Sequence, residues 1–566
     1  MIAEIIRKQI EEALKQEGYE EVPFVVEITK DLAHGDFASN VAMIIARSAK
    51  GLPAGKAGNP SEIAEKLVQH LGVDKDGYIE KVEVASPGFI NFYLSKKYLQ
   101  DSLSSAISEK EKFGWSRELM GKKVMVEYTD PNVFKPFHIG HLMSNAIGES
   151  LSRLYESAGA AVTRVNYFSD VGLAIAKAVW GMKESKGAMP QDSAPVVERT
   201  DFLGKAYAFG VAQSENPDIL IEIKEINRQI YQKQSGEYLD LYNTGRRWSL
   251  EHFELLYKKL DSHFDYLIPE SEIANSGFEI SARALREGVF IESEGAVVFP
   301  AERSGLHTRV FITKEQLPTY EAKELGLTAH KYELVPFDQS VVITASEQSD
   351  YFGVVLKAID ALLPELAGKT RHVAHGMMRL ASGKMSSRTG NIVAGQALID
   401  EVEKAVSSKN PDPVIVSVVA IGAIKYSILK QQPGKDIIFD MERSVSVEGD
   451  SGPYLQYATV RARSVLRKGV EAGLEPVVAS TGHTLEHLIG RLPDVLASAR
   501  EFMAPQILLT YLVELASSWN SYYASTQVIV EGDTQGSRER LGLVAAIAET
   551  LASGLWTIGI TVPERM

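Results

Sequence analysis

Cysteine is absent from the 566-residue sequence. Structural disulfides, zinc sites with thiolate ligands and a cysteine nucleophile are therefore excluded. Long apolar runs are also absent. The longest extends from Val414 to Ile424 and ends at Lys425, whereas a transmembrane helix needs about 20 apolar residues. The lack of cysteine fits a reducing compartment, and we expect a cytoplasmic protein with no membrane partner.

The start of the chain does not have the pattern of a signal peptide. Its first residues, MIAEIIRKQIEEALKQEGYE, place Ile2, Ile6, Ile10 and Leu14 on one face of a helix and charged residues on the other. This spacing predicts an amphipathic helix. A hydrophobic content of 45% and a charged content of 24% are typical of a globular protein. The length predicts several domains.

Positive charge is in deficit, since the formal net charge is −14. Net charge alone argues against a nucleic-acid partner, but phosphate binding depends on local patches. One such patch lies in YLQYATVRARSVLRKGV, which carries Arg461, Arg463, Arg467 and Lys468 and no acidic residue. The segment is either an RNA-facing helix or an amphipathic helix with a solvated basic face.

Three parts follow one another along the chain. Residues 1–115 mix helical segments with the strand-like EVPFVVEIT and KVEVASPGFINFYLS, which predicts an α+β domain. Residues 116–404 alternate strand-like and helix-like segments, which predicts a parallel sheet with crossover helices. Within them, residues 180–275 are polar and are predicted to be a helical insertion without strands. Residues 405–566 are predicted to form an all-α domain.

Histidine is scarce, with 12 residues, yet His138 and His141 flank Ile139-Gly140 directly after the strand-like KVMVEY. A helix that starts near His138 presents unpaired N–H groups and a positive dipole end, which bind phosphate. Both imidazoles then lie on one face of the first turn. Gly140 permits close approach of a ligand, and Lys135 adds a charge. Two partly buried histidines that cap a helix are the alternative interpretation.

A second motif is the segment GMMRLASGKMSSRTGNI, residues 376–392, which is rich in Gly, Ser and Thr and contains Lys384 and Arg388. Such a loop can fold over a triphosphate, so that backbone amides and cations meet the leaving pyrophosphate. Alone it could be a surface turn. Together the two motifs resemble the paired signature of class I aminoacyl-tRNA synthetases, His-Ile-Gly-His and a Lys-Met-Ser-Lys-Ser-type loop. The chain departs from this signature at Ser387 and Arg388.

The flanking segments resemble arginyl-tRNA synthetases over essentially the whole chain. VEYTDPNVFKPFHIGHLMSNAIGESLSRLYESAGAAVTRVNYFSDVG resembles the first active-site block of that family. GDFASNVAMIIA and VASPGFINFYL resemble its N-terminal domain, and EGDSGPYLQYATVRARSVLRK and GITVPERM resemble its C-terminal domain. The resemblance implies an α/β Rossmann-type class I catalytic core (116–404), an N-terminal domain that binds the tRNA elbow (1–115) and a C-terminal helical-bundle domain that binds the anticodon (405–566).

The resemblance also implies which residues bind L-arginine. Glu127 and Asn132 have the spacing of the glutamate and asparagine that bind the α-amino group in the family. Tyr320, Glu324 and Gln348 match the three residues that hold the guanidinium. The family has aspartate where this chain has Glu324, and a carboxylate of either length can pair with a planar guanidinium. A surface acid is the alternative for Glu324, and Asp170 is then the next candidate.

The residues assigned to ATP come from both motifs. The resemblance implies that the nucleotide is bound by His138, Gly140, His141, Lys384, Met385 and Ser386. The catalytic residues are then His138, His141, Lys135, Lys384 and Arg388. Lys135 takes the place of the missing second lysine of the loop. We expect Mg²⁺ to arrive with the nucleotide, and no structural metal.

The partners implied are tRNA(Arg), L-arginine and ATP, and a monomer is expected. Phe89 and Asn91 match an aromatic residue and an amide that meet the tRNA elbow, although Phe89 could instead belong to the core. The candidates for the anticodon are Tyr454, Tyr457, Arg461, the WNSYY stretch at 519–523 and Met566.

Three other functions are compatible with parts of this pattern. Small-molecule nucleotidyltransferases also place His-x-Gly-His on a strand-to-helix turn, but the helical C-terminal part would then be unexplained. A silent tRNA-binding relative would not need His138, His141 and Lys384. A synthetase for another amino acid is the nearest alternative, and Glu324 is the position where arginine specificity is least secure.

Overall fold

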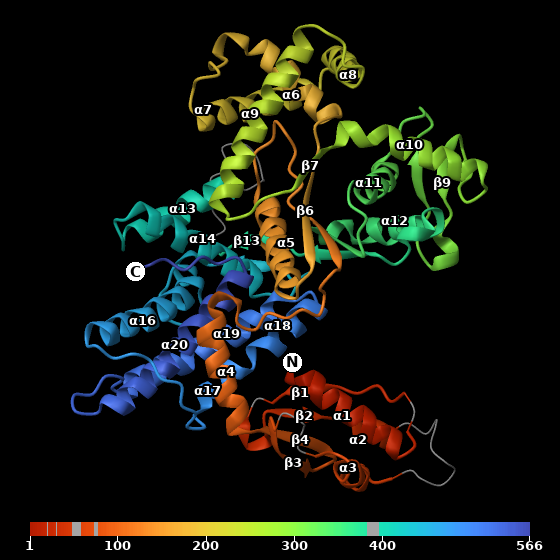
Figure 1. The fold of residues 1–566 in the computed structure, drawn as a ribbon. Helices are drawn as coiled ribbons and strands as arrows, with labels where there is room; N and C mark the ends of the chain where they lie inside the picture. The colour runs from red at the N-terminus through yellow and green to blue at the C-terminus, as the bar shows by residue number, and fades with distance from the viewer. Residues whose placement is uncertain (20, 30, 48–57, 73–76, 382–394) are drawn as a thin grey trace.

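The computed structural model describes the whole chain except residues 20, 30, 48–57, 73–76 and 382–394. Its centre is a five-stranded parallel sheet, around which helices are arranged on both faces (Figure 1). An α+β domain and a helical domain occupy the two ends of the chain. The predicted fold class is confirmed.

The central sheet has the strand order β12-β11-β5-β6-β7. All four pairs of neighbouring strands are parallel. The strands are β5 (Lys123–Glu127), β6 (Ala161–Phe168), β7 (Tyr266–Pro269), β11 (Gln339–Ala345) and β12 (Thr370–His375). Because the first strand lies in the middle, the chain changes direction across the sheet between β5 and β11, which is where open parallel sheets bind ligands.

The side chains of β5 alternate between two hydrophobic cores. Val124 and Val126 face helix α5 (Ile139–Ser157) in the core shared with the helical domain. Met125 faces the opposite core, which contains side chains of α10 (Glu270–Arg286), α11 (Tyr320–Leu334) and α12 (Ser349–Leu362). This alternation is the period of two expected of a strand, and burial of both faces explains why β5 is so apolar.

Four helices connect β6 to β7 and stand together at the top of Figure 1. They are α6 (Leu173–Glu184), α7 (Val196–Gln213), α8 (Pro217–Tyr231) and α9 (Glu237–Lys259). The helical insertion is therefore present, but the prediction that it continues without strands to residue 275 is wrong. Strand β7 has four residues, which is too short for an alternating pattern to be read, and it is fixed by its pairing with β6.

A smaller antiparallel sheet and its helices cover one side of the core. Its strands, in the order β10-β9-β8, are β8 (Ile291–Ser293), β9 (Ala296–Phe299) and β10 (Arg309–Ile312). Helices α10 and α11 cross very closely, because a Cβ atom on Gly277 would lie 2.1 Å from the Ala322 carbonyl oxygen. Glycine at position 277 therefore permits the close approach of these two helices.

The N-terminal domain is an antiparallel sheet, β1-β2-β4-β3, packed against helices. Its elements are α1 (Ile2–Gln16), β1 (Val26–Ile28), β2 (Phe37–Ser39), α2 (Val41–Arg47), α3 (Pro60–Val68), β3 (Ile79–Ala85) and β4 (Phe89–Leu94). Ile2, Ile6, Ile10 and Leu14 are all buried, as their spacing predicted.

Helix α4 (Lys96–Glu109) falls within the range predicted for the N-terminal domain, but it packs elsewhere. The Tyr98 hydroxyl on α4 donates a hydrogen bond to the Gly490 carbonyl at 2.8 Å, and α4 lies against α17 and α20 of the helical domain. Its apolar face, with Leu99 and Leu103, could not show which partner it covers. The chain between Leu94 and the central sheet therefore belongs to the helical body.

The C-terminal region is helical apart from one short strand. It contains α13 (Gly395–Ser407), α14 (Pro413–Leu429), β14 (Ile437–Phe439), α15 (Met441–Ser444), α16 (Gly452–Glu471), α17 (Thr484–Gly490), α18 (Leu492–Glu501), α19 (Pro505–Ser525) and α20 (Thr534–Thr557). Strand β14 pairs in parallel with β13 (Met378–Leu380), which precedes the predicted boundary at residue 404. That boundary also cuts α13, so the two regions are interleaved here.

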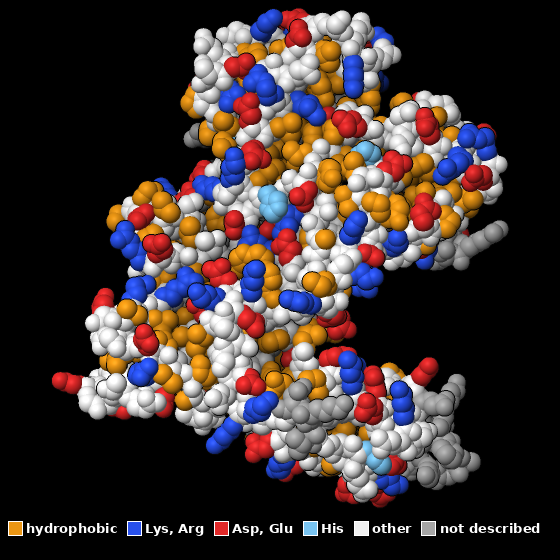
Figure 2. All heavy atoms as spheres, in the orientation of Figure 1, with side chains coloured by type: hydrophobic (Ala, Val, Ile, Leu, Met, Phe, Trp, Pro, Cys, Tyr) orange, Lys and Arg blue, Asp and Glu red, His pale blue; other side chains and the backbone are white. Residues whose placement is uncertain are grey.

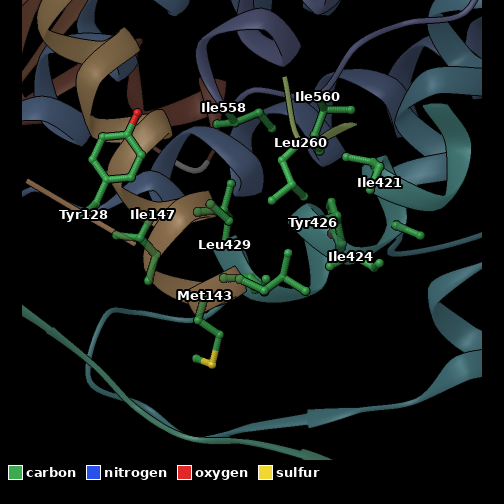
Figure 3. Close-up of a cluster of buried hydrophobic side chains, with 14 of the residues drawn as sticks. Tyr128, Met143, Ile147, Leu260, Ile421, Ile424, Tyr426, Leu429, Ile558 and Ile560 are labelled. Carbon is green, nitrogen blue, oxygen red and sulfur yellow. The ribbon is translucent and has the colours of Figure 1, made fainter. Parts of the chain in front are cut away.

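Helix α14 is the main link between the sheet and the helical domain. Figure 3 shows Met143 and Ile147 of α5 beside Leu429 of α14, with Ile558 close to them. All four belong to one continuous hydrophobic core. Among the described residues, none of the helices combines the length and apolar character that crossing a membrane requires.

Candidate active site

Most of the residues predicted to bind small ligands follow the carboxyl ends of the central strands. Glu127 is the last residue of β5, and His138 begins the helix that follows. Gln348 lies directly after β11, and Asp170 comes two residues after β6. The five strands are parallel, so these segments meet along one edge of the sheet. The change of direction between β5 and β11 lies in the middle of this edge.

His138 and His141 form the first turn of α5. His138 is the residue before the helix, with extended backbone (φ −103°, ψ 170°), and its N–H donates to Nδ1 of His141 at 3.2 Å. The two imidazole rings stack with their centres 3.5 Å apart. Since Nδ1 of His141 accepts this bond, its Nε2 carries the proton in the neutral ring and is a donor.

Both histidines are held in their neutral form. Burial, and then Lys135 and His375, lower the pKa of His138 to about 4. The pKa of His141 is well below its usual value because of burial and then because of His138, Lys135 and His375. Lys135 itself lies over the Tyr207 ring, 5.4 Å from its centre. The helix start thus combines neutral donors with one lysine.

His375 is a third histidine of this group, and the sequence analysis missed it. It is the last residue of β12, it is buried, and its Nδ1 lies 2.8 Å from the Gly376 carbonyl oxygen. Burial lowers its pKa as well. The signal in the sequence was its position: a scarce residue type immediately before the Gly-Ser-Thr loop.

The described ends of that loop lie beside the histidines. Its entry follows His375, and its exit is the start of α13, where the Gly395 N–H donates to the Phe137 carbonyl at 2.7 Å. A Cβ atom on Gly395 would lie 3.2 Å from the His138 carbonyl oxygen, so glycine keeps this approach close. Lys384, Met385, Ser386 and Arg388 lie outside the described residues. The two motifs are nevertheless brought to one place by their flanks.

A buried acidic pocket adjoins the end of β5. Glu127 and Glu324 are both buried. Lys331 of α11 donates a hydrogen bond to Glu127, whereas Glu324 forms no hydrogen bond with any of the described residues. Burial, and then the nearby Glu127, raise the pKa of Glu324 to about 8, although Lys331 opposes the shift. Glu324 is therefore not the surface acid of the alternative interpretation.

Asp130 is a further acid of this pocket that the sequence analysis did not select. It follows β5 with a left-handed backbone (φ +46°), and its Oδ1 accepts a hydrogen bond from the Tyr167 N–H at 2.8 Å. Burial and then Glu127 raise its pKa well above the usual value. The Tyr167 hydroxyl is buried without a hydrogen-bond partner in the described part of the chain. We name Glu127, Asp130, Glu324 and Lys331 the acidic pocket.

The other residues predicted to bind arginine are less buried than Glu127 and Glu324. Asn132 bridges to Ser169 through its backbone. Tyr320, the first residue of α11, is 72% exposed, and Gln348 is exposed at the start of α12. Their roles stay predictions. Asp170, the fallback for Glu324, is already occupied, because it accepts bonds from Tyr242, Arg246 and both donors of Ser271.

The predicted anticodon residues gather on α16 and α19. The Arg461 guanidinium lies 4.7 Å from the centre of the Tyr457 ring and 5.2 Å from that of Tyr523, and it donates to Asn520 at 2.6 Å. We name these four residues the α16–α19 cluster. Trp519, from the same WNSYY stretch, is instead a core residue that donates to the Ala458 carbonyl at 3.1 Å.

The remaining predicted RNA contacts differ in accessibility. Phe89 is 37% exposed, so it is not a core residue, but Asn91 two positions later is only 4% exposed. Tyr454 and Met566 are partly buried against the main core. Figure 2 shows basic and acidic side chains interspersed over the visible face. The negative net charge is thus not concentrated there.

Family models match three consecutive parts of the chain. A model described as the catalytic domain of class I tRNA synthetases (R) matches residues 102–441. A model of the arginyl-tRNA synthetase N-terminal domain matches residues 1–94, and a DALR anticodon-binding domain matches residues 455–566. The start of the first match at residue 102 agrees with the packing of α4 away from the N-terminal sheet.

Similar proteins match along most of the chain. An arginine–tRNA ligase of Clostridium acetobutylicum is 28% identical over 90% of this chain and 91% of its own length. That of Clostridium perfringens is 27% identical over 100% and 99%. The structure of Thermus thermophilus arginyl-tRNA synthetase covers 100% of both chains with a TM-score of 0.83 and 26% identity. Arginyl-tRNA synthetase from Plasmodium falciparum shares the fold, with a TM-score of 0.81 and 19% identity.

Proposed function

The chain belongs to the arginyl-tRNA synthetase family and is an ATP-dependent arginine–tRNA ligase, and we propose that its acidic pocket is where arginine is recognised. Free arginine carries two positive groups, the guanidinium and the α-ammonium. In this proposal Glu324 pairs with the guanidinium, together with Tyr320 and Gln348, and Glu127 and Asn132 hold the α-ammonium. The observation that carries the assignment is a buried carboxylate, Glu324, without a hydrogen-bond partner among the described residues.

The physical reason is the cost of leaving a buried charge unpaired. An isolated carboxylate in a protein interior takes up a proton instead of remaining charged, which is what the raised pKa of Glu324 expresses. A guanidinium supplies both the missing charge and two parallel N–H donors. An uncharged side chain of the same shape supplies neither. The pocket therefore selects a cation and rejects its neutral analogues.

We assign ATP to the start of α5 beside this pocket. The arginine carboxylate attacks the α-phosphate in line, forming the mixed anhydride, and pyrophosphate leaves with the electron pair of the broken P–O bond. The Nε2–H of His141, the His138 ring and Gly140 would contact the phosphates, and Lys135 would offset the charge of the pyrophosphate. Lys384, Met385, Ser386 and Arg388 are proposed to close over it from the loop.

The second step transfers the arginyl group to tRNA. A hydroxyl of the terminal adenosine attacks the activated carbonyl and AMP leaves. We propose that the α16–α19 cluster, with Tyr454 and Met566, binds the anticodon of tRNA(Arg), and that Phe89 and Asn91 meet the elbow. The Arg461 guanidinium close to the rings of Tyr457 and Tyr523 offers the combination of charge and aromatic faces that binds unstacked bases.

Three further parts of the proposal concern the setting of the reaction. Mg²⁺ would accompany the nucleotide and neutralise charge on the phosphates. The enzyme would act as a monomer, and it would work in the cytoplasm, where translation consumes charged tRNA. These remain predictions.

Replacing Glu324 tests the pocket assignment most directly. Glu324→Gln keeps the shape but presents an NH₂ group to a ligand that has only donors. Loss of one partner of a buried charge pair costs about 2–5 kcal/mol, so kcat/KM for arginine should fall at least tens-fold. Citrulline, the uncharged analogue, should be excluded by the parent enzyme and discriminated less strongly by the variant. Glu324→Asp should be milder.

The control is Glu321→Gln on the same helix. Glu321 is also largely buried, but its carboxylate faces Arg309 at 3.4 Å. Aminoacylation of total tRNA with arginine and with citrulline should be measured for the parent and all three variants. Equal arginine kcat/KM in the parent and Glu324→Gln enzymes would place the guanidinium outside the acidic pocket.

A further inference from the structure

Lys331 is a fully buried lysine of the acidic pocket, and neither the arginine nor the ATP assignment uses it. It lies in the last turn of α11, with 0% of its surface exposed, and its ammonium group donates to Oε2 of Glu127. The two residues are 204 positions apart in the chain. Burial by itself would lower the pKa of Lys331, but Glu127 and then Glu324 raise it above its usual value. The lysine is therefore charged.

The charges of the pocket are unbalanced without a ligand. Three carboxylates, those of Glu127, Asp130 and Glu324, share the space with the single ammonium group of Lys331, and each of the three interacts with it electrostatically. Fully ionised, the pocket carries an excess of two negative charges. The two cationic groups of arginine, its guanidinium and its α-ammonium, match this excess in number.

The contact of Lys331 also restricts Glu127. A carboxylate has two oxygens, and Lys331 holds Oε2. Because Glu127 is buried at the end of β5 and its Oε2 is held by Lys331 of α11, the carboxylate has little freedom to turn. The other oxygen is left for a second cation. A lysine fixed in this way orients an acid for a ligand instead of binding the ligand itself.

We propose that Lys331 is a positioning residue for the amino acid: it fixes Glu127 so that one oxygen receives the α-ammonium group, and it leaves an excess of two carboxylates for the two cationic groups of the substrate. The proposal rests on the assignment of arginine to the acidic pocket. Its specific content is that Lys331 acts on the α-ammonium end of arginine, whereas Glu324 acts on the guanidinium end.

Removal of the lysine has a defined electrostatic consequence. Lys331→Met leaves Glu127 buried and uncompensated, and such a group is expected to take up a proton. The titratable groups that interact with Lys331 are Glu127 at the end of β5, Asp130 after it and Glu324 of α11. Tyr167 of β6 and Tyr351 of α12 interact in turn with Glu127 and Glu324. Without Lys331, ionisation of the carboxylates becomes harder, so arginine should bind productively only at higher pH.

The test compares arginine with 5-guanidinopentanoate, which has the guanidinium but no α-ammonium group. KM for arginine in tRNA charging, and inhibition by the analogue, should be measured from pH 6.5 to 9.5 in the parent enzyme and in Lys331→Met. In Lys331→Met we expect KM for arginine to rise about ten-fold or more and inhibition by the analogue to change about three-fold or less. We also expect the rise of kcat/KM with pH to occur at higher pH than in the parent enzyme.

Two controls separate this role from a structural one. Lys357→Met removes an exposed lysine on α12 and should behave as the parent. The double variant Lys331→Met/Glu127→Gln removes both charges, so it should fold even where the single variant fails, and it should still bind arginine poorly. A double variant with the KM for arginine and the pH dependence of kcat/KM of the parent enzyme would overturn the proposal. So would an equal loss of arginine and analogue binding.

The outcome is distinguishable from failure of the pocket assignment. Were arginine bound elsewhere, Glu324→Gln would keep the parental kcat/KM. Were only the role of Lys331 wrong, Glu324→Gln would be impaired while the Lys331 variants retained the parental response to arginine and its analogue.

Discussion

At the scale of single residues, burial decides the protonation of the site. His138 and His141 are neutral because burial, Lys135 and His375 disfavour a second proton on either ring. A neutral imidazole donates one hydrogen bond without holding a fixed charge, so product pyrophosphate is not retained as tightly as by a cation. In the proposed site the fixed positive charge is assigned to Lys135, Lys384 and Arg388. Glu324 is the opposite case, because burial and Glu127 raise its pKa, and we propose that its charge appears when arginine supplies the partner.

Replacement of either histidine should therefore affect chemistry more than stability. His138→Ala or His141→Ala should lower the rate of arginine activation by about 10²-fold, as expected for loss of one preorganised donor. Pyrophosphate exchange in the presence of tRNA measures this rate. His252→Ala, a largely buried histidine of α9 whose pKa is also lowered by burial, is the control. Near-normal rates in both site variants would mean that the phosphates of ATP do not bind at the start of α5.

The residue scale also shows how far the sequence could be interpreted. The motif spacing predicted a site at His138 and His141, whereas Glu127 and Glu324 were predicted through the family resemblance, and their roles stay predictions. Lys331 could not be found in this way. Its meeting with Glu127 depends on how α11 packs against β5, which no local pattern records. The same holds for Asp170, whose four hydrogen bonds come from residues far along the chain.

At the scale of elements, long periodic segments were predictable and short ones were not. α1 and α5 were expected where they occur, because several buried positions repeat along each. β7 and β14 have four and three residues, which is too few for a period to be recognised, and they exist because a neighbouring strand supplies their hydrogen bonds. α4 was recognisable as a helix, but its partner was not, since an apolar face does not identify what covers it.

The α16–α19 cluster is the element-scale hypothesis for RNA binding. Arg461→Ala removes the charge held between Tyr457 and Tyr523, so tRNA affinity should fall and the salt dependence of binding should decrease by about one unit of log–log slope. Arg463→Ala, two positions along the same helix and near Glu549, is the matched control and should change less. Affinity should be measured by titration over a salt series. An equal loss of tRNA affinity in Arg461→Ala and Arg463→Ala would mean that the positive charge of the helix as a whole, and not the α16–α19 cluster, binds the RNA.

At the scale of the whole molecule, α5 joins the active site to the helical domain. The histidines are at its start, while Arg153 near its end donates to the Trp556 carbonyl at 3.0 Å and to the Asp261 carbonyl at 2.8 Å. Lys425 of α14 donates to the carbonyls of Leu260 and Gly559 at 2.6 and 2.7 Å. The C-terminal tail, the insertion and the sheet are thus fixed to one another, and a cut at residue 404 would expose the apolar face of α5.

A single assay tests the central claim that this whole assembly charges tRNA with arginine. The parent enzyme, ATP and total tRNA should be incubated separately with each of the twenty amino acids, and the aminoacyl-tRNA formed should be measured. The account predicts charging with arginine and background levels with the other nineteen, lysine included, because the acidic pocket is matched to a guanidinium. Charging with a different amino acid, or with none, would contradict it.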